Sequence, residues 1–149
     1  MRRREVAGHG WCVPSWDAIG VIAGENLGSG EPSRKLLRDG PDEQQYLWSG
    51  YRLRFFRDAC ESYWCNLTVD QPRLFVVCRP GEEGGDLEPF IITADQDEAG
   101  SAVETDDQVF AVNMPPQIYH HLERYVVENY EPQPRRKRKR KNWSERPPS

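Results

Sequence analysis

The clearest hydrophobic run in the chain is RLFVVCR, from Arg73 to Arg79. Apolar and β-branched residues fill it and prolines bound it on both sides, which is the pattern of a buried β-strand. A turn-rich segment, PGEEGGDLEP, leads to a second apolar run, PFIITA. We predict that these two strands form an antiparallel hairpin with a wide loop. The run VFAVNM predicts a last strand, and the acidic segment before it, DQDEAGSAVETDDQ, predicts a short helix.

Helical spacing is clearest after the last predicted strand. Pro115 and Pro116 suit the first turn of a helix, where a missing N–H costs nothing. Apolar residues then recur at intervals of three and four, namely Ile118, Leu122, Tyr125 and Val126. We predict a helix from about Pro115 to Tyr130 that lays this stripe against a sheet and ends before the prolines that follow.

The first half of the chain has a weaker pattern. WCVPSWDAIGVIAG predicts one strand, around Trp16 to Ala23, and the Gly-, Pro- and acid-rich segment after it predicts a long loop in which Leu36 and Leu37 anchor a short turn. From Tyr46 to Phe55 the apolar residues nearly alternate, with Gly50 shifting the phase, which predicts two strands or one bulged strand. DACESYWCN predicts a helix of one or two turns, with Asp58 as its N-cap and Glu61 completing an approximate capping box.

These elements predict an α+β fold. We expect a mainly antiparallel sheet, partly closed into a barrel, covered by the C-terminal helix. A chain of 149 residues is long enough for one domain with a core and short for two. The predicted organisation is a flexible basic N-terminus over residues 1–10, a single globular domain over 11–131 and a disordered basic tail over 132–149.

Charge is distributed unevenly along the chain. Residues 1–134 hold 12 Lys+Arg against 23 Asp+Glu, a net charge of −11, whereas residues 135–149 hold 8 against 1, a net charge of +7. A like-charged polar tail cannot bury a surface, so we expect it to be disordered in the free protein. An acidic body repels phosphate, which leaves the tail as the part that could hold nucleic acid.

The sequence also predicts the cellular compartment of the protein and the redox state of its cysteines. No stretch approaches the roughly 18 to 20 apolar residues that span a bilayer, and the first residues lack the apolar run of a secretory signal. We therefore expect a cytoplasmic protein with no membrane partner, whose four cysteines stay reduced.

Candidate chemistry is sparse. Zinc is usually held by Cys and His, but the spacing of Cys60 and Cys65 and the adjacency of His120 and His121 suit a metal site poorly, and we predict no metal ligands. Cys78 is expected in the core. A redox role of Cys60 or Cys65 stays open, because a helix N-terminus can lower a thiol pKa. No nucleophile elbow, phosphate loop or dinucleotide fingerprint is present, so we predict no catalytic residues, no cofactor and no enzyme.

The basic run is the strongest candidate for a binding site. It can bind an acidic protein surface, nucleic acid or anionic lipid, or serve only as a solubilising run, and we favour protein contact because the body is acidic. Trp143 lies beyond the run and has no core to join, so we interpret it as an anchor on a partner. The predicted partner-binding residues are Arg135, Arg136, Lys137, Arg138, Lys139, Arg140, Lys141 and Trp143.

The order of segments resembles a small bacterial family of unknown function whose genes commonly lie beside molybdenum-dependent formate dehydrogenase genes. The likeness is carried by WDAIGVIAG, YWCNLTVDQPRLFVVCRP, PFIITAD, VNMPP and the final Lys/Arg run, and it spans roughly Trp11 to Lys141. The resemblance implies a non-catalytic accessory role in maturation or assembly of a formate dehydrogenase-like molybdoenzyme. The implied partners are a subunit of that enzyme or another accessory protein, and the alternative is a nucleic-acid-binding regulator that uses the same tail.

Overall fold

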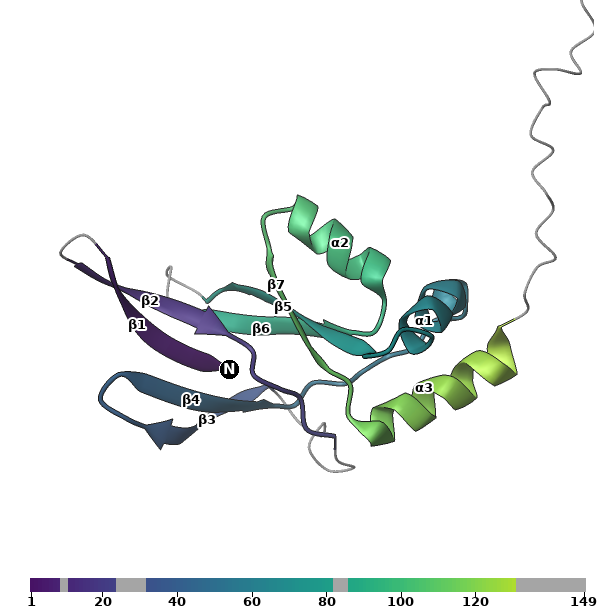
Figure 1. Cartoon of the computed structure of the whole chain (residues 1–149), viewed down its shortest axis with the longest axis horizontal. Coiled ribbons are helices and arrows are strands. Elements are labelled where there is room, and N and C mark those ends of the chain that lie inside the picture. The colour runs from purple at the N-terminus through teal and green to yellow at the C-terminus, as the bar shows by residue number, and fades with distance from the viewer. Residues whose placement is uncertain (9–10, 24–31, 82–85, 131–149) are drawn as a thin grey trace, which may run out of the picture.

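The structure is a computed structural model that describes residues 1–8, 11–23, 32–81 and 86–130. Seven strands form two antiparallel sheets, and three α-helices and one short 3-10 helix complete the described fold (Figure 1). The α+β class and the antiparallel pairing are therefore as predicted. The partly closed barrel was wrong, because the described strands form two separate sheets and no closed barrel.

The four-stranded sheet comes from the first third of the chain, in the order β2-β1-β4-β3. Its strands are β1 (Arg2–Gly8), β2 (Trp11–Asp17), β3 (Ser33–Asp39) and β4 (Glu43–Ser49). Neighbouring strands β1 and β2 pair over their whole length, and so do β3 and β4 apart from a bulge between Leu36 and Arg38. Only Arg2 to Arg4 of β1 pair with β4, so the two hairpins are joined over a short stretch.

The predicted flexible N-terminus is instead a strand. The Arg2 Nε donates to Asp17 Oδ1 at 3.0 Å and lies 3.5 Å from Glu43 Oε1, so ion pairs link β1 to both neighbouring strands. Met1 is buried, with 8% of its surface exposed, and its carbonyl accepts from the Tyr46 N–H at 2.8 Å. A run of arginines that reads as a solvated end is thus fixed by carboxylates that come later in the chain.

Other expectations for the first half also need correction. The predicted strand at Trp16 to Ala23 lies earlier, as β2, and the segment predicted as a long loop contains β3. β3 was missed because all seven of its residues are exposed, so no alternation of buried and exposed positions marks it. β4 ends just before Gly50, the residue at which the apolar alternation shifts phase. Gly50 has φ 92°, a left-handed conformation that glycine adopts without strain.

The three-stranded sheet follows the sequence pattern closely. β5 (Arg73–Pro80) is the central strand, flanked by β6 (Leu87–Thr93) and β7 (Gln108–Asn113), both antiparallel to it. Leu74, Val77 and Cys78 of β5 are at most 1% exposed, which confirms the buried strand and the core position of Cys78. Helix α2 (Gln96–Glu104) packs on this sheet, and its N-cap Asp95 accepts from the Asp97 N–H at 2.9 Å.

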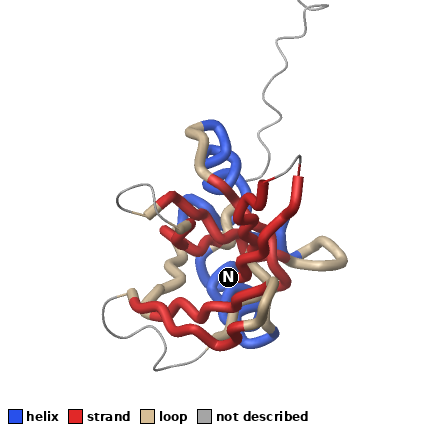
Figure 2. Tube along the Cα trace, turned by 90° about the vertical axis from the view of Figure 1, so that its left-hand side faces the viewer, coloured by secondary structure: helices blue, strands red, loops and turns tan. Residues whose placement is uncertain are grey.

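The other two helices meet at one end of this sheet (Figure 1), the end that lies away from the viewer in Figure 2. α1 (Cys60–Leu67) follows the 3-10 helix η1 (Arg57–Ala59), so its N-cap is Ala59, without a side-chain cap, and not Asp58. α3 (Pro116–Asn129) confirms the predicted C-terminal helix, and Leu122 and Val126 of its stripe are fully buried. α3 packs beside α1, so the stripe faces a helix as well as the sheet-based core.

One buried amide connects α1 to the sheet. Asn66 is 6% exposed, and its Nδ2 donates to the carbonyls of Arg73 at 2.7 Å and Ala94 at 3.0 Å. Its Oδ1 accepts from the Arg73 N–H at 3.0 Å. A single side chain therefore satisfies backbone groups at the start of β5 and just after β6, which would otherwise be buried without partners.

We expect Asn66→Ala to lower the free energy of unfolding by about 3 kcal/mol, because it leaves the part-buried N–H and carbonyl of Arg73 and the buried carbonyl of Ala94 without this partner. Asn113→Ala is the control, since Asn113 is exposed at the end of β7, and its effect should stay within about 0.5 kcal/mol. Urea denaturation followed by circular dichroism measures both. Equal destabilisation by the two substitutions would show that the Asn66 hydrogen bonds are not what holds α1 to the sheet.

Candidate functional site

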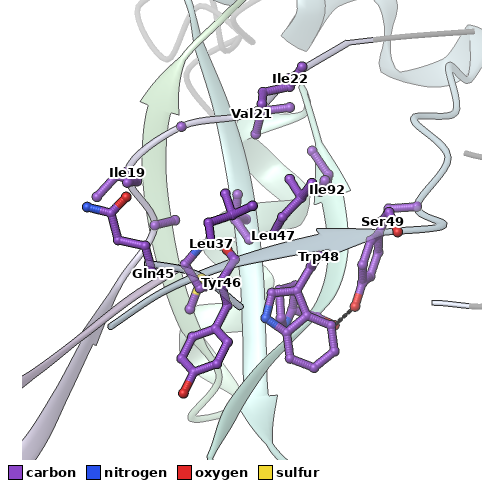
Figure 3. Close-up of a pocket in the computed structure, with 16 residues that line it drawn as sticks. Ile19, Val21, Ile22, Leu37, Gln45, Tyr46, Leu47, Trp48, Ser49 and Ile92 are labelled. Carbon is purple, nitrogen blue, oxygen red and sulfur yellow. Dashed lines mark hydrogen bonds between the residues drawn. The ribbon is translucent and has the colours of Figure 1, made fainter. Parts of the chain in front are cut away.

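An apolar pocket of about 360 Å³ lies beside β4. The segment from Ala18 to Ile22, which follows β2, lines one wall, and Leu37 of β3 with Leu47 of β4 lines another. Val76, Pro89 and Ile92 bring the three-stranded sheet to the same cavity, so it lies where the two sheets meet. In Figure 3 the side chains of Leu37 and Leu47 are on the side of β4 that faces Val21 and Ile22.

The β-bulge in β3 positions Leu37 at this pocket. Leu36 is opposite Tyr46 and Arg38 is opposite Gln45, so Leu37 is the extra residue between two paired positions. A bulge of this kind re-aims a side chain at the edge of a sheet. The adjacent leucines, which the sequence predicted to anchor a turn, are therefore two exposed residues of an edge strand.

Apolar side chains at the mouth of the pocket are unusually exposed. Ile19 is 51% exposed, Ile22 68% and Leu37 56%. Single exposed hydrophobic residues are normal, but several that gather around an apolar hollow are typical of an interaction site. This group is the candidate docking site, and none of its members was among the sequence-predicted contact residues.

Two of the polar side chains that line the pocket have hydrogen-bond partners within the protein. The Tyr51 hydroxyl donates to the Pro89 carbonyl at 2.8 Å. Burial raises the pKa of Tyr51 to about 12. The Ser49 hydroxyl shares a hydrogen bond of 2.8 Å with Ser33 Oγ. These two hydroxyls are therefore engaged within the protein.

Trp48 adds a buried polar atom next to the pocket. Its indole Nε1–H is buried and has no acceptor among the described residues. The guanidinium of Arg34 lies 5.7 Å from the centre of the Trp48 ring and 4.8 Å from that of Tyr46. In Figure 3 Trp48 and Tyr46 are on the opposite side of β4 from Leu47. Arg34 and these two rings therefore pack together on that opposite face of the strand.

A second hollow is acidic. It lies at the N-terminal ends of α1 and α2 and is lined by Asp58, Glu61, Asp95, Asp97 and Glu98 among others. Asp95 caps α2, which gives that carboxylate a structural role. Among the residues that the structure describes, no group of three or more His, Cys, Asp or Glu is arranged to hold a metal ion.

The cysteines and histidines considered from the sequence are not brought together. Cys60 and Cys78 are buried, with 1% and 0% of their surfaces exposed, and Cys65 is exposed. Burial raises the pKa of the Cys60 thiol and raises that of Cys78 to about 12, which is the opposite of thiol activation. His120 is exposed on α3 and its ring contacts Tyr119.

The predicted partner-binding residues, Arg135 to Lys141 and Trp143, lie outside the described residues. Along the described chain, no helix has the length and hydropathy needed to cross a bilayer. The pocket residues were missed because they are distant in sequence and their exposure depends on how two sheets meet. The available signal was the pair of adjacent leucines flanked by Lys and Arg, which no solvated turn requires.

Comparison with known proteins identifies the family. Residues 1–139 match the model of DUF3305, a protein family of unknown function, and the chain belongs to this family. The match includes both sheets, all three helices and the first five residues of the basic run. Comparisons with the curated proteins and with the solved structures gave no match.

We expect Cys65 to react with a thiol reagent in the folded protein, whereas Cys60 and Cys78 react only on unfolding. The reason is that a buried thiol with a raised pKa is neither accessible nor ionised near neutral pH. The measurement is titration with DTNB in a Cys12→Ser background, followed by a repeat in denaturant. Rapid reaction of Cys60 in the folded state would restore the redox interpretation.

We also expect Tyr51 to make stability depend on alkaline pH. The pKa of Tyr51 is raised to about 12 in the folded state from an ordinary value near 10, so over this window the unfolded chain binds fewer protons and stability falls as pH rises. Tyr51→Phe removes this contribution, and its urea midpoint should fall less steeply from about pH 10 to 12 than that of the native protein. An unchanged slope would contradict the burial of the phenol.

Proposed function

We propose that the protein is a non-catalytic accessory factor in the maturation or assembly of a formate dehydrogenase-like molybdoenzyme, and that it docks on a protein partner. The single observation that carries a docking role is the apolar pocket, whose mouth is surrounded by half-exposed Ile19, Ile22 and Leu37. The client is suggested by the resemblance of the sequence to a family encoded beside formate dehydrogenase genes. Family membership itself gives no activity.

Charge supports a partner with an acidic surface. Residues 60–131 hold 3 Lys+Arg against 15 Asp+Glu, a net charge of −12, whereas residues 1–59 hold 9 against 8, a net charge of +1. The four-stranded sheet and the basic run are thus the parts of the chain that do not repel an acidic surface. In this proposal Arg135 to Lys141 steer association and Trp143 adds an anchor that loses its water on binding.

The alternative, a nucleic-acid-binding regulator, uses the same basic run. The acidic second half of the domain disfavours it, because its net charge of −12 repels a phosphate backbone. The two functions differ in their response to salt and to nuclease, which makes one experiment sufficient to separate them.

We expect full-length protein to co-precipitate formate dehydrogenase subunits or their accessory proteins from native cell extract. A chain in which Arg135 to Lys141 are all replaced by Gln should recover at least about tenfold less, since it lacks electrostatic steering by the tail. The difference should shrink at high salt, where the Debye length falls to about 3 Å at 1 M. Quantitative mass spectrometry after nuclease treatment makes the measurement.

The matched control is a chain with Gln at seven exposed acidic positions in the second half of the domain, which changes as many charges without touching the basic run. It should recover at least as much partner as the native chain. Recovery of nucleic acid and its companions alone, removed by nuclease, would reject the accessory function in favour of the regulator. Equal recovery by the native chain and the tail variant would reject docking through the tail.

A further inference from the structure

Two exposed cations, Lys35 and Arg38, share a face of the β3–β4 hairpin with residues that line the apolar pocket. Lys35 is opposite Leu47 in the β3–β4 register and Arg38 is opposite Gln45, and both partners line the pocket. Residues directly opposite in an antiparallel pair have their side chains on the same face of the sheet. Lys35 and Arg38 therefore lie on the face that contains the pocket, and both are exposed.

Nearby carboxylates do not neutralise these two cations. Glu43 lies 3.5 Å from Arg2 and 3.6 Å from Arg4, and Asp17 accepts from Arg2. Asp39 is opposite Gln44, from which it accepts a 3.5 Å hydrogen bond, so its side chain lies on the other face of the sheet from that of Arg38. Within the described chain, neither Lys35 nor Arg38 has an ion pair, in contrast to Arg34 on the same strand, which lies 3.4 Å from Asp86.

The shape of the pocket favours a side chain of another protein over a free small molecule. A volume of about 360 Å³ is at the lower end of the range for ligand pockets, about 300 to 1,000 Å³. A small-molecule site uses several converging polar groups, but here the Tyr51 and Ser49 hydroxyls are bonded within the protein, which leaves Gln45 as the polar side chain on the same side of β4 as Leu47. The apolar surface also continues past the mouth over Ile19, Ile22 and Leu37, which suits an anchor on a longer segment.

We propose that this pocket binds an apolar anchor side chain from an acidic segment of the partner protein, with Lys35 and Arg38 contacting the carboxylates that flank the anchor. This inference deepens the proposed function and rests on it, because the partner is the acidic surface engaged by the basic run. The pocket supplies the desolvated centre of the interface, and the two cations form its charged rim. The anchor side chain provides affinity and fixes the position of the partner segment, whereas the basic tail raises the rate of association.

Photocrosslinking in the native cells tests the proposal with the full-length chain. A p-benzoylphenylalanine replaces Leu37, and a control chain carries it at Val127, which is 73% exposed on α3. Both positions are exposed, so neither substitution removes a core contact, and circular dichroism verifies folding. Ile22, 68% exposed, is a second probe position at the same pocket.

The expected product is a crosslink from position 37 and from position 22 to one segment rich in Asp and Glu around an apolar residue. Lys35→Glu combined with Arg38→Glu should reduce its yield at least about fivefold, because like charges repel across the rim. Arg54→Glu combined with Arg124→Glu changes the net charge equally at exposed positions away from the pocket and should leave the yield unchanged. Peptide mass spectrometry identifies the segment.

Several results would overturn the proposal. They are a yield at positions 37 and 22 no higher than at 127, a crosslink to a second copy of this chain, a crosslink to a neutral or basic segment, or equal loss in both charge-reversal variants. An acidic segment from a protein unrelated to formate dehydrogenase would uphold the pocket and reject the client. Co-precipitation of formate dehydrogenase subunits without a crosslink at the pocket would uphold the client and reject the pocket as its docking site.

Discussion

The side-chain amide of Asn66 holds together elements that are separated in sequence. Its three hydrogen bonds reach the N–H and carbonyl of Arg73 and the carbonyl of Ala94, so the end of α1 is fixed to the start of β5 and to the residue after β6. Because α3 packs beside α1, the position of the C-terminal helix depends on the same bonds. A buried polar group this well satisfied specifies one arrangement, since any shift of α1 leaves backbone groups unpaired in the core.

The two sheets are stabilised by different interactions. The three-stranded sheet is stabilised by burial, with Leu74, Val77 and Cys78 nearly inaccessible and α2 packed on it. The four-stranded sheet relies more on ion pairs and on contact with that core through Met1, and its edge strand β3 is exposed throughout. An element with so little burial adds little stability, so a surface for binding can be built there without weakening the core.

Charge follows the same division. Nearly all of the net negative charge of the domain belongs to residues 60–131, which form the core sheet and the helices, whereas residues 1–59 are close to neutral. Most residues that line the apolar pocket belong to the near-neutral part, and so do Lys35 and Arg38, which have no ion pair within the described chain. In the proposed function, this separation would orient an acidic partner toward the pocket over distances of about a Debye length, roughly 8 Å at physiological salt.

The sequence by itself determined the elements that carry a strong period or a continuous apolar run. β5, β6, β7, α2 and α3 were predicted, since burial of an apolar face imposes a pattern that local reading detects. β1 and β3 were not, because arginines paired with distant carboxylates and an exposed edge strand leave no such pattern. The N-cap of α1 and the separation into two sheets were also set by packing. Only the tertiary structure placed the segment at Ala18 to Ile22 beside Leu37, Leu47 and Ile92, because a pocket between two sheets is a property of how they meet.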